Sequence, residues 1–117
     1  MSEVTIYHNP RCSKSRQTLA LLEERGITPT VVKYLEAPPD ERTLARILSQ
    51  LGLAPRQLMR KKEEPYSALG LDDQSLSDDA LIQAMVDNPV LIERPIVVAN
   101  DQAALGRPPE NVLSILA

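Results

Sequence analysis

A cysteine in a basic segment is the most reactive feature of this sequence. Cys12 is the only cysteine and lies in YHNPRCSKSR (7–16), after a short apolar run and a proline-containing loop, where a helix is expected to begin. Three basic side chains are close to it in the sequence: Arg11, Lys14 and Arg16. The N–H groups and positive dipole of a helix start stabilise a thiolate, the nucleophilic form, and also bind oxyanions. We predict an activated nucleophile beside an anion site; the alternative is a small core residue.

The residues that follow Cys12 exclude two kinds of cysteine enzyme. A low-molecular-weight tyrosine phosphatase has an arginine at the position held here by Thr18, and a two-cysteine oxidoreductase has its second cysteine where this chain has Ser15. A single-cysteine enzyme needs an external thiol, such as glutathione, to resolve its intermediate. The chain also has too few cysteine and histidine residues for a structural zinc site, so we expect no metal.

Two polar neighbours are candidates for tuning the thiolate. His8, the only histidine, precedes Cys12 in the same segment. It either tunes or deprotonates the thiol, or it is a loop histidine that hydrogen-bonds the backbone. Ser15 either donates a hydrogen bond to the thiolate from the first helical turn or is simply a favourable early-helix residue.

The composition indicates a small protein from a reducing compartment. A length of 117 residues predicts one domain, residues 1–117, whose core lacks Trp and Phe and is built from Leu, Ile, Val, Ala and Met. A net charge of −3 suggests neither nucleic acid nor an anionic membrane as a partner. Without an apolar run that could span a membrane, and with one cysteine, the sequence favours a cytoplasmic location.

The first part of the chain predicts a strand, a helix and a second strand. The strands are expected at 4–7 and 29–34, and the helix from about Ser13 to Arg25, ended by Gly26. Short links of this kind imply a parallel pair of strands with a right-handed crossover.

The rest of the chain predicts a helical middle and a final hairpin with a helix. One helix is opened by Asp40 and closed by Gly52, a shorter one runs from Pro55 through Lys62, and a third is capped by Ser77 and ended by Pro89. The hairpin pairs 95–99 with 103–105, and Pro108-Pro109-Glu110 starts the last helix. The order β-α-β, helices, β-β-α predicts an α/β protein with a mixed four-stranded sheet, as in the thioredoxin-like fold.

Four segments together resemble a known enzyme family. YHNPRCSKSR, RKKEEPY, ERPIVV and GRPPE occur in the order and at the spacing of the glutaredoxin-linked arsenate reductases (ArsC type), most closely their short YfgD-like branch, over essentially the whole chain. The resemblance implies that Cys12 attacks arsenate and that three arginines hold the oxyanion: Arg60, Arg94 and Arg107. It further implies that glutathione, a co-substrate rather than a bound cofactor, attacks the thiol-bound arsenate, and that glutaredoxin regenerates the enzyme.

Each arginine also has a simpler interpretation. Arg60 stands beside Lys61 and Lys62, a charge run typical of a solvated helix face. Arg107 sits in a turn, where arginines commonly serve solubility. Arg94 interrupts an apolar stretch directly before a proline, so its charge needs a partner or ligand; if that proline is cis, as in thioredoxin-like folds, Arg94 is delivered to the thiol. Guanidinium is suited to the task because its planar fork matches a tetrahedral oxyanion.

Two other functions stay open at this point. Spx-type proteins share the fold and bind RNA polymerase as regulators, but they carry a second cysteine where this chain has Ser15. A monothiol redox protein with little arsenate activity is the other alternative. It is suggested by Ser13-Lys14, where efficient plasmid-type enzymes have glycine and threonine, and by the absence of their longer C-terminal tail.

Overall fold

The computed structural model describes residues 3–116, which form two compact units. The sheet unit comprises the chain up to Ala37 together with the chain from Arg94 onward, and the helical unit comprises Pro38–Glu93. No helix among residues 3–116 has the length and apolar character needed to span a membrane.

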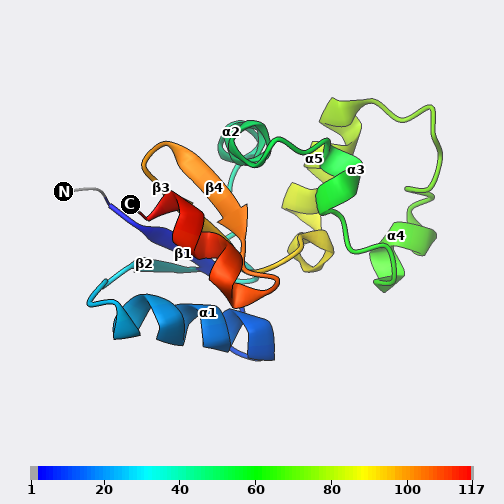
Figure 1. The fold of residues 1–117 in the computed structure, drawn as a ribbon. Helices are drawn as coiled ribbons and strands as arrows, with labels where there is room; N and C mark the ends of the chain where they lie inside the picture. The colour runs from blue at the N-terminus through cyan, green and yellow to red at the C-terminus, as the bar shows by residue number, and fades with distance from the viewer. Residues whose placement is uncertain (1–2, 117) are drawn as a thin grey trace. The chain divides into compact units, whose positions relative to one another are not determined.

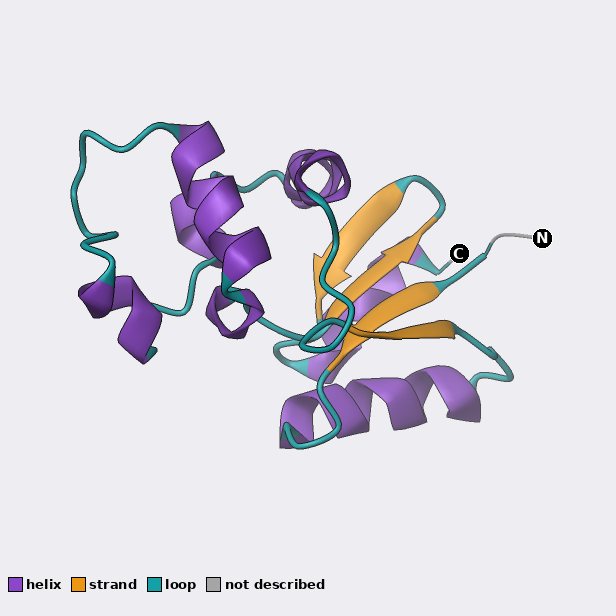
Figure 2. Cartoon of the chain, turned by 180° about the vertical axis from the view of Figure 1, so that it is seen from behind, coloured by secondary structure: helices purple, strands orange, loops and turns teal. Residues whose placement is uncertain are grey.

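The sheet unit is built on a mixed four-stranded sheet (Figure 1). Its strands are β1 (Thr5–His8), β2 (Thr30–Lys33), β3 (Ile96–Ala99) and β4 (Gln102–Leu105), and its helices are α1 (Ser13–Glu24) and the 3₁₀ helix η2 (Pro109–Ile115). The strand order is β2-β1-β3-β4, with β1 parallel to β2 and antiparallel to β3, and β3 antiparallel to β4. The predicted β-α-β and β-β-α arrangement is therefore confirmed, and Figure 2 shows its strands in orange.

An aliphatic core lies on one face of this sheet, under α1 and η2. Leu22 of α1 and Val112 of η2 are fully buried against Ile6 of β1 and Val97 of β3. Side chains alternate along a strand, so His8 points to the same face as Ile6, toward α1. The strand ends one residue later than predicted, and for this reason His8 belongs to β1 and not to the following loop.

The hairpin between β3 and β4 turns on two residues with positive φ. Asn100 has a φ of 54° and Asp101 a φ of 59°, the conformation of the two-residue turns that match strand twist. Asn100 also donates a side-chain hydrogen bond to the carbonyl oxygen of Ile115 at 2.7 Å, which ties the turn to the end of η2. The predicted hairpin is confirmed.

The last helix has a tighter geometry than the sequence suggests. It was expected as a helix starting at Pro108-Pro109-Glu110, and η2 instead closes i to i+3 hydrogen bonds, as from Asn111 N–H to Pro108 O at 3.0 Å. Val112 and Ile115 are both buried, and a spacing of three residues places them on one face of a 3₁₀ helix.

The helical unit has well-defined helix caps. It contains α2 (Glu41–Leu51), α3 (Pro55–Leu58), α4 (Glu64–Ala68), α5 (Asp78–Asp87) and η1 (Pro89–Leu91). Asp40 accepts a hydrogen bond from Thr43 N–H at 2.7 Å at the start of α2, and Gly52 ends that helix with a φ of 71°. Ser77 caps α5 in the same way, accepting from Ala80 N–H at 3.1 Å. These predicted boundaries are confirmed.

The prediction of one helix from Pro55 through Lys62 is wrong. The helix ends at Leu58, because Met59 becomes extended and pairs antiparallel with Ile92. Arg60 N–H donates to Leu91 O at 2.7 Å, so Arg60 does not lie on a solvated helix face. Pro65 is the second residue of α4, where a proline gives up no intrahelical hydrogen bond.

Candidate active site

Cys12 is the N-cap residue of α1, as predicted. Its backbone is extended, with φ −94° and ψ 123°, and its N–H donates to Asn9 O at 3.0 Å. The thiol is free and only 9% exposed. The next three amides, at 13–15, are the helix-start N–H groups that have no carbonyl acceptor within the helix. The sulfur therefore sits at the positive end of the α1 dipole.

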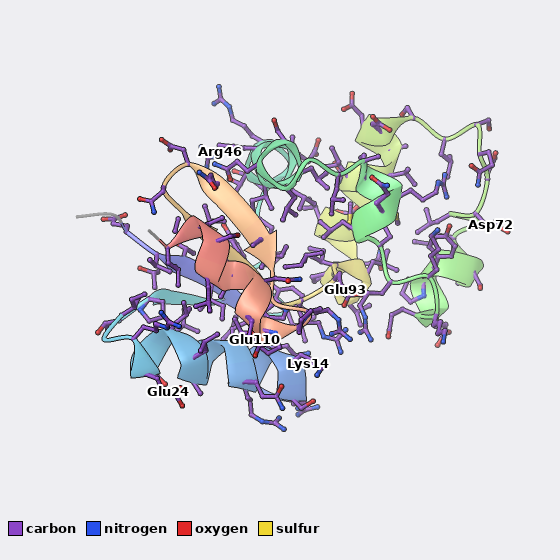
Figure 3. The ribbon with its side chains drawn as sticks, in the orientation of Figure 1. Lys14, Glu24, Arg46, Asp72, Glu93 and Glu110 are labelled. Carbon is purple, nitrogen blue, oxygen red and sulfur yellow. The ribbon has the colours of Figure 1, made fainter. Side chains whose placement is uncertain are left out.

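Basic residues occupy the first turn of α1, where acidic residues are normally preferred. The turn contains Lys14 and Arg16 and no acidic side chain, and Figure 3 labels Lys14 there. Cations at a helix N-terminus are unfavourable to the helix but attract an anion. Arg16 also donates from Nη1 to Pro10 O at 2.9 Å, which holds the loop before Cys12 in place.

A buried polar group links the end of β1 to α1 beside the thiol. Ser15 Oγ lies 2.6 Å from His8 Nδ1 and accepts a hydrogen bond from Asn9 N–H at 3.0 Å. His8 is 6% exposed and Ser15 is fully buried. Within residues 3–116 the side-chain hydrogen bonds of Ser15 go to these two groups and none to the Cys12 sulfur. The direct contact of Ser15 with the thiolate thus stays a prediction.

The tautomer of His8 decides which way the Ser15 hydroxyl points. Burial lowers the pKa of His8, and the positive charges of Lys33 and Arg16 lower it further, so the ring is neutral near neutral pH. If Nδ1 is unprotonated, Ser15 donates to it; in the other tautomer Nδ1–H donates to Ser15 and the hydroxyl proton is directed to a third acceptor. The partner of His8 Nδ1 is thus the Ser15 side chain, whereas the simpler interpretation expected a backbone group; the tuning of the thiol by His8 stays a prediction.

The strand register brings Arg94 to the loop that carries Cys12. Tyr7 pairs with Ile96 across β1 and β3. Continued by one residue, this register sets Pro95 opposite His8 and Arg94 beside the loop after β1. The Arg94–Pro95 peptide, whose isomer the sequence left open, is cis, and the Nε and Nη1 atoms of Arg94 are buried.

Arg107 reaches the same edge of the sheet from β4. Gly106 N–H donates to Pro95 O at 3.0 Å, extending the β3–β4 register beyond its last paired residues. Arg107 donates from Nη1 to Arg94 O at 3.2 Å. The Arg107–Pro108 peptide is a second cis bond, which the sequence analysis did not anticipate. Cys12, Arg94 and Arg107 thus lie in three segments that converge at one edge.

Gly106 and Thr18 set the spacing of these segments, and the sequence analysis assigned them no such role. A Cβ on Gly106 would clash with Thr18 Oγ1 and would lie 2.8 Å from Pro95 Cγ. Thr18 is fully buried and donates to Lys14 O at 2.8 Å. Only glycine lets β4 approach α1 this closely. The signal available in the sequence was the glycine directly before a candidate site arginine.

Arg60 belongs to the helical unit and is held there by two carboxylates. Its Nη1 lies 3.0 Å from Glu63 Oε2, and its Nε lies 3.7 Å from Glu93 Oε1. All three side chains are between 27% and 29% exposed, so these are partly solvated ion pairs. The backbone of Arg60 is fixed by the pairing of the 58–60 segment with the 91–93 segment. Arg60 belongs to a different unit from Cys12, so its part in the oxyanion site stays a prediction.

Metal-ligating side chains are not clustered in residues 3–116. No group of three or more His, Cys, Asp or Glu side chains in this range is placed to hold a metal ion.

Comparison with known proteins assigns this arrangement to a family. The sequence matches the ArsC family over residues 7–115. The chain is 56% identical over 117 residues to an arsenate reductase from Neisseria meningitidis, covering 99% of this chain and 100% of the relative. The chain belongs to the ArsC family. A second relative, the uncharacterized protein YfgD from Escherichia coli K12, is 63% identical over 115 residues, 97% of each chain.

A solved structure confirms the fold of this ArsC-family chain. The arsenate reductase from Vibrio cholerae superposes with a TM-score of 0.95 and 62% sequence identity, covering 97% of this chain and 98% of that one. Arsenate reductases of this kind have the thioredoxin-like fold. The predicted fold class and the predicted family are therefore both confirmed.

Proposed function

We propose that this protein reduces arsenate to arsenite, with the Cys12 thiolate as nucleophile and glutathione as the second thiol. The observation that carries the proposal is the convergence of the Cys12 loop, Arg94 and Arg107 at one edge of the sheet. A thiolate at a helix start beside guanidinium groups fits a reaction in which a tetrahedral oxyanion is attacked by sulfur. The relative from Neisseria meningitidis, named as an arsenate reductase, supports the same substrate.

The reaction proceeds in two bond exchanges. The Cys12 thiolate attacks the arsenic of arsenate, a sulfur–arsenic bond forms, and one arsenate hydroxyl takes up a proton from solvent and leaves as water. The glutathione thiolate then attacks the Cys12 sulfur of this thiol-bound arsenate. A disulfide forms between glutathione and Cys12, and the electron pair of the broken sulfur–arsenic bond stays on arsenic, reducing As(V) to As(III), which leaves as arsenite. The two sulfur atoms supply the two electrons.

Arginines stabilise the charge on the oxygens during these steps. Arg94 and Arg107 bind the arsenate at one edge of the sheet unit, and Arg60 is the third arginine that the family resemblance assigns to the oxyanion. Guanidinium groups stay charged and offer paired donors to two oxygens at once. Donors fixed before the reaction cost little reorganisation when charge develops on the leaving oxygen. Ser15, directed by His8, stabilises the thiolate from the first turn of α1.

The enzyme depends on outside partners rather than on a bound cofactor. Having a single cysteine, it leaves the reaction as a mixed disulfide with glutathione, and glutaredoxin or a second glutathione reduces this bond. Such a cycle requires a reducing compartment, and we assign the protein to the cytoplasm. Residues 1–117 act as one arsenate reductase domain in this proposal.

An arsenite assay with purified protein, glutathione and glutaredoxin tests the proposal. We expect arsenite formation that saturates with arsenate and is inhibited by phosphate, which shares the oxyanion geometry. A protein that becomes glutathionylated without forming arsenite would instead be a monothiol redox protein. A stable complex with RNA polymerase and no reductase activity would identify a regulator of the Spx type.

A further inference from the structure

A pocket opens beside the Cys12 loop on the side of β2. It has a volume of about 340 Å³ and is lined by residues 8–11, Lys33, Leu35 and Glu36, all in the sheet unit. β1 and β2 are parallel, so both strands end at this pocket. The crevice beyond the carboxyl ends of parallel strands is the usual ligand site of open α/β sheets. Arg94 and Arg107 are not among the lining residues, so this space is distinct from the oxyanion side.

The lining carries two positive charges and one negative charge. Arg11 and Lys33 supply the cations, and Glu36 supplies the carboxylate. All three residues are exposed to solvent, and Leu35, with 42% of its surface exposed, adds an apolar wall. A ligand that complements this lining has two carboxylates, one ammonium group and an aliphatic body.

Hydrogen bonds donated by backbone N–H groups hold both rims of the pocket. On one rim Arg11 N–H donates to Asn9 Oδ1 at 3.0 Å. On the other, the N–H groups of Glu36 and Ala37 both donate to Lys33 O at 2.9 Å, closing a turn directly after β2. The charged residues are therefore presented by ordered turns, which lowers the entropy lost when a ligand binds.

We propose that this pocket binds glutathione, the co-substrate of the proposed function on which this inference rests. Arg11 and Lys33 bind its two carboxylates, Glu36 binds its ammonium group, and Leu35 covers its aliphatic part. A volume of about 340 Å³ lies within the range of small-molecule sites. Bound there, the glutathione sulfur is beside the loop whose next residue is Cys12, and it attacks the thiol-bound arsenate as described above.

Binding of S-methylglutathione, which cannot react, tests the pocket without relying on turnover. In heteronuclear NMR titrations we expect shifts of the Asn9, Arg11 and 33–37 amides. Lys33→Gln and Arg11→Gln should each raise Kd about three- to fivefold, the effect of losing one solvent-exposed ion pair. Arg46→Gln, which removes an exposed arginine on α2 (labelled in Figure 3), should leave Kd unchanged.

Two results would overturn the pocket assignment. One is that wild type and the three variants all bind S-methylglutathione with the same Kd, or that the amides that shift lie outside the pocket. The other is that inorganic phosphate moves the same amides as strongly as S-methylglutathione, which would make the pocket a general oxyanion site.

Steady-state kinetics separate this inference from the proposed function. Lys33→Gln should raise KM for glutathione and leave KM for arsenate unchanged, and the difference from wild type should vanish with mercaptoethanol, which has no carboxylate. Arsenate reduction with an unaltered KM for glutathione contradicts the pocket alone. Pocket binding of S-methylglutathione without arsenite formation contradicts the proposed function alone.

Discussion

Arg107 donates a hydrogen bond from Nη1 to the backbone carbonyl oxygen of Arg94, 3.2 Å away, across the ends of β4 and β3. Two arginines that are 13 residues apart in the sequence are thus linked directly at the edge of the sheet. The bond orients the Arg107 side chain along the residue that precedes the cis proline, and the register of β1 and β3 sets the backbone of that residue beside the loop after β1.

Loss of either arginine should weaken catalysis without unfolding the protein. We expect Arg94→Ala and Arg107→Ala each to lower kcat/KM for arsenate at least about tenfold, since each removes a charge-assisted contact with the oxyanion. Because both side chains are assigned to the same oxyanion, the double variant should lose less than the product of the two single effects. The control is Arg25→Ala, an exposed arginine at the end of α1. An equal loss of kcat/KM in Arg25→Ala would argue against a specific role of Arg94 and Arg107.

Neutralising the carboxylates around Arg60 should strengthen arsenate binding. Glu63 and Glu93 pair with Arg60 and add negative charge beside a group assigned to a dianion. Glu63→Gln and Glu93→Gln are each expected to lower KM for arsenate about threefold by removing this repulsion. Stability should change little, since partly exposed ion pairs contribute at most about 1 kcal/mol.

Glu64→Gln provides the matched control for these two variants. It removes the same charge from the neighbouring residue, which forms no ion pair with Arg60 within residues 3–116. If all three variants shift KM equally, net charge rather than the pairing of Arg60 is responsible. If Glu63→Gln and Glu93→Gln leave KM unchanged, these carboxylates do not limit arsenate binding.

Gly106→Ala tests the close packing that positions Arg107. The new methyl group meets Thr18 and Pro95 at distances that require the segments to separate. We expect a loss of about 1–3 kcal/mol in the free energy of unfolding, as for other overpacked sites, together with a lower kcat. Adding Thr18→Ala removes the nearest obstacle and should restore part of both. A fully stable and active Gly106→Ala variant would show that this spacing is not required.

The sequence was sufficient to predict the structure where local sequence signals and tertiary packing favour the same conformation. Asp40, Gly52 and Ser77 cap their helices as predicted, because capping depends on side chains a few residues apart. The hairpin followed from Asn100 and Asp101, which favour positive φ. The position of Cys12 at a helix start was visible because the preceding strand and loop are short.

The sequence was insufficient to predict the structure where contacts between distant residues decide the conformation. Arg60 was expected in a helical charge run, but pairing of Met59 with Ile92 ends the helix first. The Arg107–Arg94 bond and the contact of Gly106 with Thr18 join residues far apart in the chain, and no local pattern encodes them. The one-residue extension of β1 that buries His8 is likewise fixed by its pairing with β2.

The buried histidine should make stability pH-dependent. The pKa of His8 is lowered in the folded state by burial and by nearby cations, so the unfolded chain binds more protons as the pH falls through the usual histidine range. The free energy of unfolding should therefore decrease from about pH 7.5 to about pH 5. In His8→Gln this decrease should be smaller, as measured by urea denaturation across the range. An identical decrease in both proteins would assign it to other groups.

Arsenite formation by the Cys12→Ser variant is the most direct test of the central claim, that the Cys12 thiolate attacks arsenate. With glutathione and glutaredoxin present, wild type and a Ser13→Ala control are expected to form arsenite from arsenate. The Cys12→Ser variant, folded by circular dichroism, should form none above the rate without enzyme. Arsenite formation by Cys12→Ser at the wild-type rate would contradict the account.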